Sequence, residues 1–409
     1  MAAERGAALL RRRSSSARTT FLELFFDLVF VFALTRVSQR LLDDLPATGW
    51  ALVGATGRTL LLFLALWLIW MITTWVTSRY EPQRGVIQLV VIGSMFGSLM
   101  LGVALPKALE ERAVPFAVAY VAVMLGRPLI VAAALGGHPR RLVPLRLAAW
   151  AAVSAVPWLA GALGPDPLRV PLWVLALTVD YVGLFTGWPV PRFGAAPARG
   201  WLITGEHLAE RYQQIFLIAL GESILVIGIT YSGEDFSGRG AGAFTVSFVT
   251  IALLWRIYFH RAGDLLAVAL RVARSPGRLG ASAAVTHLFI VLGVLTAAVG
   301  YELVIAHPYG RGELGWLLFV VGGPALFLAA RARFEYEIFA RVSVSRVLGV
   351  LLLVLLAPLL ARGAPVLALS GVAGVLALVA LLDALRSRGR PAEQPASPLG
   401  RERRPGDVE

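Results

Sequence analysis

The sequence predicts an all-α fold, a polytopic bundle of about twelve transmembrane helices, and three observations support it. The chain of 409 residues is 57% hydrophobic and only 15% charged, whereas about one quarter of the residues in a soluble domain are charged. The apolar residues form runs of about 20, the length that spans a hydrocarbon core. Basic clusters occupy every second connection. The runs are also too long and too uniform to be strands of a membrane barrel.

The first half of the chain contains six such runs, each ended by Pro, Gly or charged residues. A basic stretch, residues 1–19, precedes the first run. Glu23 and Asp27 interrupt this run and no small-residue cleavage site follows it, so we expect a retained helix rather than a cleaved signal. The expected helices are residues 20–42, 52–76, 86–105, 114–135, 142–163 and 168–188.

A connection rich in Pro and Gly, residues 189–205, separates these six runs from a second set of six. Because six is an even number, both halves, residues 20–188 and 206–386, would start on the same membrane side, as in a parallel repeat. The tail, residues 387–409, has no apolar periodicity and is expected to be disordered. The helices of the second half are expected at residues 206–231, 241–259, 281–305, 314–332, 343–360 and 366–385.

Charge placement predicts the orientation and the partners. Arg residues gather before the first run, in every second connection and in the tail, as expected for segments facing an anionic inner leaflet. We therefore expect a multi-pass protein of the bacterial cytoplasmic membrane with both termini in the cytoplasm. The net charge of +13 lies in these clusters and not on a soluble module, so nucleic acid is not an expected partner. The sequence is compatible with a homo-oligomer of this chain.

Cofactor chemistry has little support in the composition. The chain contains no cysteine and only five histidines. Disulfides and thiolate metal sites are thereby excluded, and the histidines are not closely paired along the chain. We expect no metal and no cofactor.

Acids inside the first apolar run are the first functional signal. Glu23 and Asp27 are four residues apart and therefore share one helix face. Thr20 and Glu23 have the spacing of a capping box, so a structural role for Glu23 is as well supported as a functional one. Asp27 lies one turn deeper, beyond any capping role, and is expected to line an ion path or to form a buried ion pair.

The seventh run carries the second signal. Glu222, with Ser223 next to it, lies near the middle of this run and is, of all the acids, the hardest to explain as a helix cap or an interface residue. The alternative to a functional role is a buried salt bridge to an Arg of another helix, such as Arg127. His207, Glu210 and Arg211 lie at the start of the run, where they could form only a surface cluster. The full set of candidate path residues is Glu23, Asp27, Arg127, Asp180, Glu210, Arg211, Glu222, Ser223 and His287.

Two segments resemble a known family. Residues 21–33, Phe-Leu-Glu-Leu-Phe-Phe-Asp-Leu-Val-Phe-Val-Phe-Ala, and the segment His-Leu-Ala-Glu-Arg at 207–211, followed by Ile-Ala-Leu-Gly-Glu-Ser-Ile at 218–224, are similar to the signature of the bacterial low-temperature-requirement A (LtrA) family. Length and hydropathy fit across nearly the whole chain. The resemblance implies a membrane protein linked to stress or growth in the cold.

The first run also shows a more distant resemblance. Its pattern, with Leu22, Glu23, Phe25, Asp27 and Phe30, is similar to the first-helix signature of the endolysosomal and bacterial potassium channels marked by Arg-x-x-x-Phe-Ser-Asp. This chain has Phe where that signature has its Arg and its Ser. This second resemblance implies an ion path beside the first helix.

Three functions follow as alternatives. The leading hypothesis is a channel or transporter for a cation or small solute, because intramembrane acids usually face a path or a partner. The second is a non-catalytic scaffold or stress factor whose buried charges only pair helices. The third is an intramembrane enzyme that acts on a lipid-linked substrate. Against it, the sequence contains neither a nucleophile elbow nor a metal constellation. We therefore do not expect an enzyme.

Overall fold

The computed structural model describes residues 6–11, 18–192, 194–195, 205–234, 238–260, 262–273, 276–310, 312, 314–388 and 393–398. Within these ranges the chain is almost entirely helical, and the only β-type pairings are two isolated bridges, Leu10 with Tyr80 and Val190 with Gly194. The predicted all-α fold is therefore confirmed. Much of the N-terminal stretch, of the connection 189–205 and of the tail lies outside the described residues.

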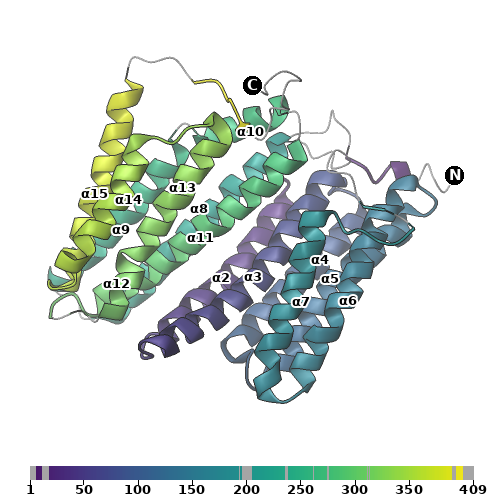
Figure 1. Ribbon diagram of the computed structural model, residues 1–409, viewed down its shortest axis with the longest axis horizontal. Coiled ribbons are helices and arrows are strands. Elements are labelled where there is room, and N and C mark those ends of the chain that lie inside the picture. The colour runs from purple at the N-terminus through teal and green to yellow at the C-terminus, as the bar shows by residue number, and fades with distance from the viewer. Residues whose placement is uncertain are drawn as a thin grey trace, which may run out of the picture. The chain divides into compact units, whose positions relative to one another are not determined.

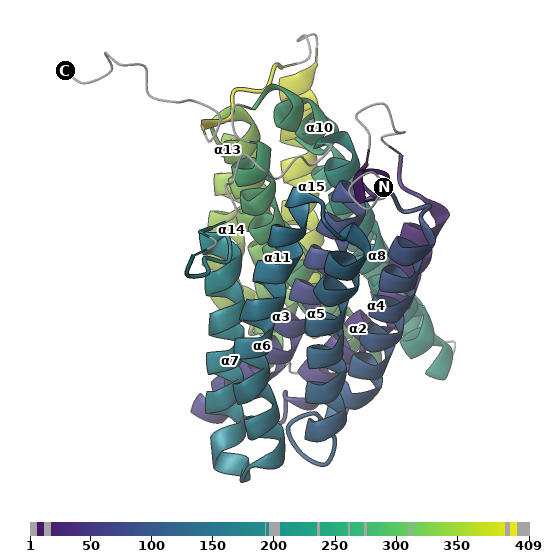
Figure 2. The ribbon, with the colours of Figure 1, turned by 90° about the vertical axis from the view of Figure 1, so that its right-hand side faces the viewer.

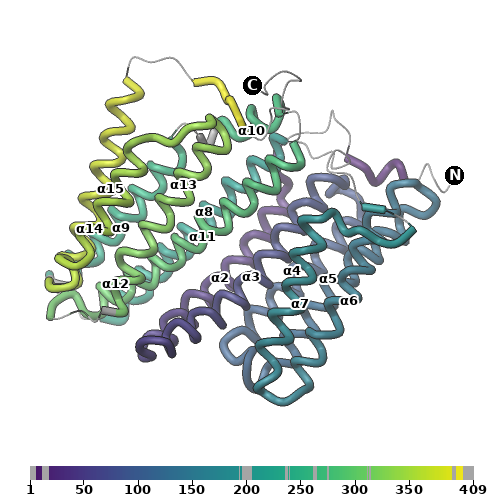
Figure 3. The backbone as a smooth tube through the Cα atoms, in the orientation of Figure 1, coloured from purple at the N-terminus to yellow at the C-terminus, as the bar shows by residue number. Residues whose placement is uncertain are grey.

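The chain divides into two compact units, and Figure 3 traces it through both. The first unit comprises Met1–Arg40 and Gly49–Leu208, and the second comprises Leu41–Thr48 and Ala209–Glu409. The helices of the first unit are α2 (Phe21–Asp43), α3 (Trp50–Arg79), α4 (Gly85–Ala104), α5 (Ala113–Leu135), α6 (Leu142–Leu163) and α7 (Asp166–Thr186). The last turn of α2 belongs to the second unit.

The second unit contains most of α8 and all of the helices that follow it (Figure 1). These are α8 (Gly205–Gly233), α9 (Gly238–Phe259), α10 (Ala262–Val272), α11 (Pro276–Ala306), α12 (Leu314–Val320), α13 (Gly322–Phe339), α14 (Val344–Leu360) and α15 (Pro365–Ser387). All twelve expected runs are thus helical, one of them as the consecutive pair α12 and α13.

Ten helical spans among the described residues are long and apolar enough to cross a membrane. Two of the expected helices fall outside that set for simple reasons. The helix α2 carries Glu23, Asp27, Arg36 and Arg40 within 23 residues, and α14 is only 17 residues long. A multi-span helical membrane protein accounts for both, since α2 buries Glu23 and Asp27 and a helix of about 17 residues is at the short limit for spanning.

The structure differs from the expected helix boundaries in two places. The expectation did not include α10, an amphipathic helix that buries Leu266, Ala269 and Leu270 and exposes Arg271. The tenth expected helix was also predicted to end at residue 332, but α13 continues to Phe339. The extension is stable because pairs of opposite charge four residues apart, Arg331–Glu335 and Arg333–Glu337, lie along it.

Helices that follow one another in the first unit pack as antiparallel neighbours. The pairs α4–α5, α5–α6 and α6–α7 are in contact, and Figure 2 shows these helices side by side. Large aromatic side chains fill the space between α5, α6 and α7. The Tyr120 and Trp158 rings have centroids 4.4 Å apart, and those of Trp158 and Trp173 are 4.9 Å apart. This packing fixes the helices that carry Arg127 and Asp180.

Glycines set the closest helix contact of the second unit, between α11 and α13. A Cβ atom on Gly323 would lie 2.5 Å from the backbone nitrogen of Ala297, and one on Gly293 would lie 2.7 Å from that of Phe327. Backbone atoms cannot move aside as side chains do, so only glycine fits at these two positions.

We therefore expect Gly323→Ala to lower the melting temperature of the detergent-solubilised protein, at a cost near the upper end of the roughly 1–3 kcal/mol typical of overpacking. Gly374→Ala in α15 is the matched control, because nothing lies within 4 Å of its added Cβ. Alanine is favoured over glycine in a helix by about 1 kcal/mol, so the control should be neutral or stabilising. Equal melting temperatures for the two variants would contradict the close contact.

Candidate functional site

The acid at the start of α2 performs two tasks at once. One carboxylate oxygen of Glu23, Oε2, accepts from the backbone N–H of Thr20 at 2.9 Å and from its hydroxyl at 2.8 Å. This is the capping contact that the sequence predicted. The other oxygen, Oε1, lies 2.8 Å from Nε2 of His207 at the start of α8. The expected capping contact is therefore present, and the same side chain also meets a histidine that the sequence did not indicate as its partner.

The Glu23–His207 pair lies wholly inside the first unit. His207 is completely buried and Glu23 is 1% exposed, so neither group reaches water. On its other side, Nδ1 of His207 lies 2.9 Å from the hydroxyl oxygen of Ser78 at the end of α3. That oxygen in turn lies 2.8 Å from the carbonyl oxygen of Thr74. Polar atoms of α2, α3 and α8 thus form one buried chain of contacts.

The contacts of this chain determine how many protons it holds. The Thr74 carbonyl can only accept, so the Ser78 hydroxyl donates to it, and Nδ1 of His207 must then donate to the Ser78 oxygen. Two lone pairs cannot face each other at 2.8 Å, so one further proton lies between Nε2 and the Glu23 carboxylate. The pair therefore holds one proton that either residue can carry, and it is neutral overall.

Asp27 lies one helical turn beyond Glu23 on the same buried face. It is fully buried, and its Oδ1 accepts from the indole N–H of Trp70 in α3 at 3.1 Å. The opposite face of this turn, which includes Phe25 and Leu28, is exposed. As the shared-face prediction required, both acids point inward and meet side chains from neighbouring elements.

Arg127 and Asp180 occupy other places in the first unit. Asp180 of α7 accepts from the Tyr120 hydroxyl at 2.8 Å, and among the residues that the structure describes it bonds to neither Glu23 nor Asp27. The Arg127 guanidinium of α5 donates to the Thr73 hydroxyl at 2.7 Å. The candidates of this unit thus separate into an acid pair on α2 and two isolated groups.

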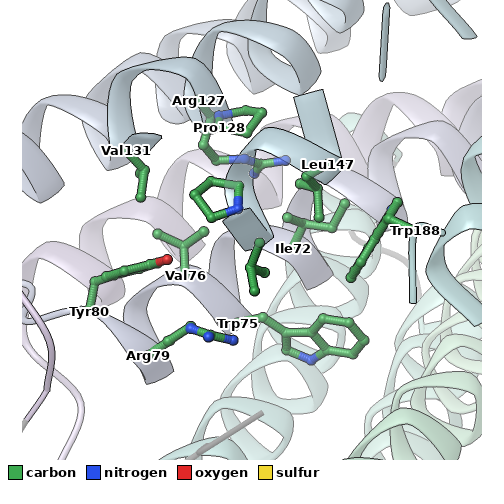
Figure 4. A pocket seen from close by; sticks show the side chains of 12 residues that line it. Ile72, Trp75, Val76, Arg79, Tyr80, Arg127, Pro128, Val131, Leu147 and Trp188 are labelled. Carbon is green, nitrogen blue, oxygen red and sulfur yellow. The ribbon is translucent and has the colours of Figure 1, made fainter. Parts of the chain in front are cut away.

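Arg127 lines a small apolar cavity of about 50 Å³ between the C-terminal parts of α3 and α5 and the N-terminal part of α6, with Arg79, Tyr80 and Trp75 around it (Figure 4). Tyr80, just beyond the end of α3, is almost completely buried, and burial raises the pKa of its phenol. The phenol therefore stays protonated at neutral pH and contributes no negative charge to the cavity.

The candidates of the second unit lie on α8 and α11. Arg211, Glu222 and Ser223 are completely buried, whereas Glu210 is partly exposed. Arg211 donates to the amide oxygen of Gln214 at 3.0 Å, and Ser223 donates to the Ala219 carbonyl at 3.1 Å. The surface-cluster alternative is therefore wrong for Arg211, as it is for His207.

His287 has a structural environment. Its Nδ1 lies 2.7 Å from the Ala283 carbonyl, and its Nε2 lies 2.9 Å from the Tyr258 hydroxyl. One neutral tautomer satisfies both contacts, since Nδ1–H donates and Nε2 accepts. The ring also stacks on Tyr212 at 4.7 Å. Its contacts do not join it to any of the other candidates among the described residues.

A buried ion network in the second unit was not indicated by the sequence. Arg346 of α14 lies 2.6 Å from the Asp383 carboxylate of α15 and 3.3 Å from that of Glu335 in α13. Arg331 of α13 lies 3.6 Å from Glu335 and donates at 2.7 Å to the carbonyl of His260, which follows α9. Both Arg residues are completely buried, so they are not surface charges facing a leaflet.

His260 lies at the edge of this network and remains neutral. Burial lowers the pKa of its imidazole, and the nearby cations Arg256, Arg346 and Arg331 lower it further, although Asp383 opposes them. Its charge therefore does not change around neutral pH. No group of three or more His, Asp or Glu side chains among the described residues is arranged to hold a metal ion.

Comparison with known proteins decides the family. The model of the bacterial low temperature requirement A protein (LtrA) matches residues 18–381. The chain belongs to the LtrA family. An uncharacterized protein of Rhizobium meliloti (strain 1021) is 37% identical to it over 326 residues, 78% of each chain. No solved structure matches this LtrA chain.

The matched region contains both signature segments and therefore every candidate of the first and seventh expected helices. In the structure these two segments meet through Glu23 and His207. The sequence resemblance named both residues within its motifs but gave no sign that they form a pair, because they are far apart along the chain.

Proposed function

We propose that this LtrA protein moves a cation or small solute across the bacterial cytoplasmic membrane, and that protonation of the Glu23–His207 pair is coupled to this movement. The observation that carries the proposal is the completely buried contact of 2.8 Å between the two side chains, from which we infer one proton shared by the pair. Ionisable groups away from water are costly and are retained mainly where they pair or carry protons and ions.

Asp27 extends the same buried face, and the proposal gives it the role of a second binding group on the path. A buried carboxylate on a helix face shared with a second acid favours a cation as its ligand. Trp70 fixes its orientation through the contact at 3.1 Å. On this proposal the protein is not an enzyme, has both termini in the cytoplasm, binds no nucleic acid, and supports growth under cold or other stress through its transport activity.

The test is flux in liposomes that contain the purified full-length protein. A potassium gradient is imposed, and an internal pH dye and a potassium-sensitive dye report the two ions. We expect Asp27→Asn and Glu222→Gln to reduce flux to the level of protein-free liposomes, and Glu23→Gln to abolish the proton signal. The matched control is Glu111→Gln, an exposed acid whose partner is the exposed Lys107.

Each variant must first elute as a single folded species, so that lost flux is not lost protein. Normal flux in both Asp27→Asn and Glu222→Gln would overturn the proposal.

The buried network of Arg331, Glu335, Arg346 and Asp383 favours a second candidate, a non-catalytic scaffold. Charge-neutral variants that keep the stability of the protein and its effect on growth in the cold, with no flux in the wild type, would support the scaffold.

A further inference from the structure

Within the described part of the chain, no carboxylate pairs with the buried guanidinium of Arg127. Among the residues that the structure describes, its partners are the Thr73 hydroxyl at 2.7 Å, the Ile69 carbonyl at 3.4 Å and the Met124 sulfur at 3.3 Å. No described residue bonds to its Nε, and the side chain is only 3% exposed. Arginine does not lose its proton in proteins, and a buried charge without an opposite charge costs several kcal/mol.

The same residue lines a large groove between α4 and α5. The groove has a volume of about 530 Å³ and an almost entirely apolar lining. This volume falls in the range of about 300–1,000 Å³ that is typical of ligand sites. Several of its lining side chains, among them Phe96 and Val118, are among the exposed large apolar residues. In a spanning bundle the groove therefore opens to the lipid acyl chains.

Glycines keep the groove open. Gly93 and Gly126 line it from the two helices, and nothing lies within 4 Å of a Cβ added at either position. At Gly97, by contrast, a Cβ would lie 2.1 Å from a methyl group of Val123. The helices thus touch at Gly97 and leave space about one turn away, beside Gly93 and Gly126.

The groove has one polar end. Because α4 and α5 are antiparallel neighbours, it runs along α5 from Pro115 to Ile130, and Arg127 lies close to the second of these residues. Pro115 and Arg127 are about 18 Å apart at 1.5 Å per residue. The hydroxyl of Ser94, another lining residue, already donates to the Val90 carbonyl at 2.8 Å. Arg127 is therefore the one charged residue among those that line this long apolar slot, and it lies near one end.

We propose that the groove between α4 and α5 binds a long-chain carboxylate, with the carboxylate at Arg127 and the acyl chain along the groove toward Pro115. A planar carboxylate matches the guanidinium and supplies the missing negative charge. Arg127 lies eight residues before the end of α5 at Leu135, about 12 Å along the axis. At this distance from the end of the helix, a single-chain lipid with a small head group fits better than a phospholipid with its larger head group. The site is independent of the proposed transport path on α2.

The test measures binding of radiolabelled palmitate to the delipidated full-length protein in a non-ionic detergent. We expect saturable binding of one palmitate, competed by unlabelled palmitate but not by methyl palmitate, sodium acetate or phosphatidylglycerol. Arg127→Gln should weaken binding about tenfold or more, because it removes a charge-assisted bond. Gly93→Leu and Gly126→Leu should abolish binding by filling the groove.

The matched control is Gly54→Leu on α3, where the added Cβ also meets nothing within 4 Å and which does not line the groove. It should bind palmitate as the wild type does. The thermal stability of every variant is measured alongside, and Gly93→Leu and Gly126→Leu should retain it. Equal binding of methyl palmitate, or full binding by folded Gly126→Leu, would overturn the proposal. If phosphatidylglycerol displaced the labelled palmitate at a lower concentration than unlabelled palmitate does, a single-chain carboxylate would be the wrong ligand.

Discussion

Arg346→Leu is expected to lower the free energy of unfolding by about 3–5 kcal/mol, the cost of removing one member of a buried ion pair. Arg346 is completely buried and lies 2.6 Å from the carboxylate of Asp383 and 3.3 Å from that of Glu335. Removing it leaves two carboxylates in the packed interior with one nearby cation, Arg331, which contacts only Glu335 among these acids. The contacts between α13, α14 and α15 should be the first to open.

The measurement is denaturant or thermal unfolding in a fixed detergent, with Arg341→Leu as the control. Arg341 also pairs with an acid, Glu393, but both side chains of that pair are partly exposed. Its loss should cost less than about 1 kcal/mol. Neutralising the acids as well, in Arg346→Leu/Glu335→Gln/Asp383→Asn, should restore most of the stability. If Arg346→Leu and Arg341→Leu are equally stable, the network does not hold the helices together.

The sequence located the helices well because their signal is local. Every expected apolar run is helical, and the break that produces α12 and α13 falls inside one of them. The helix α10 was not expected because it is only 11 residues long and amphipathic, which resembles a polar connection in a hydropathy count. The end of α13 was misplaced because Arg331 and Arg333 resemble the charges that end a spanning run, whereas their partners Glu335 and Glu337 lie one turn farther along the same helix.

Side-chain partners were harder to predict because they depend on which helices meet. Thr20 and Glu23 are neighbours in the chain, and their capping contact was predicted. His207 was expected at a surface, but it is completely buried against an acid from the other end of the first unit. Asp383 gave no signal, since an acid in the last turns of a helix usually faces water. The spacing of residues along one helix predicts a shared face, but not the partner opposite it.

The second large effect is expected from the buried Glu23–His207 pair. It is a loss in the free energy of unfolding, measured for Glu23→Gln, His207→Gln and the double variant. Either single change leaves a buried polar group whose partner cannot supply or share the proton, and we expect each to cost about 3–5 kcal/mol. Because both changes break one interaction, their costs should not add. The double variant should be more stable than the sum of the single losses predicts, with a coupling energy of about 1–3 kcal/mol.

The control cycle uses Lys107 and Glu111, an exposed pair 3.0 Å apart in the connection between α4 and α5, for which a coupling below about 1 kcal/mol is expected. Ser78→Ala tests the proton count separately, because it removes the acceptor of Nδ1 and should cost about 1–3 kcal/mol. The infrared spectrum of Glu23→Gln should lose one carboxyl band relative to the wild type. Single losses that add within the experimental error would mean that Glu23 only caps α2, and the coupling of this pair to transport would lose its physical basis.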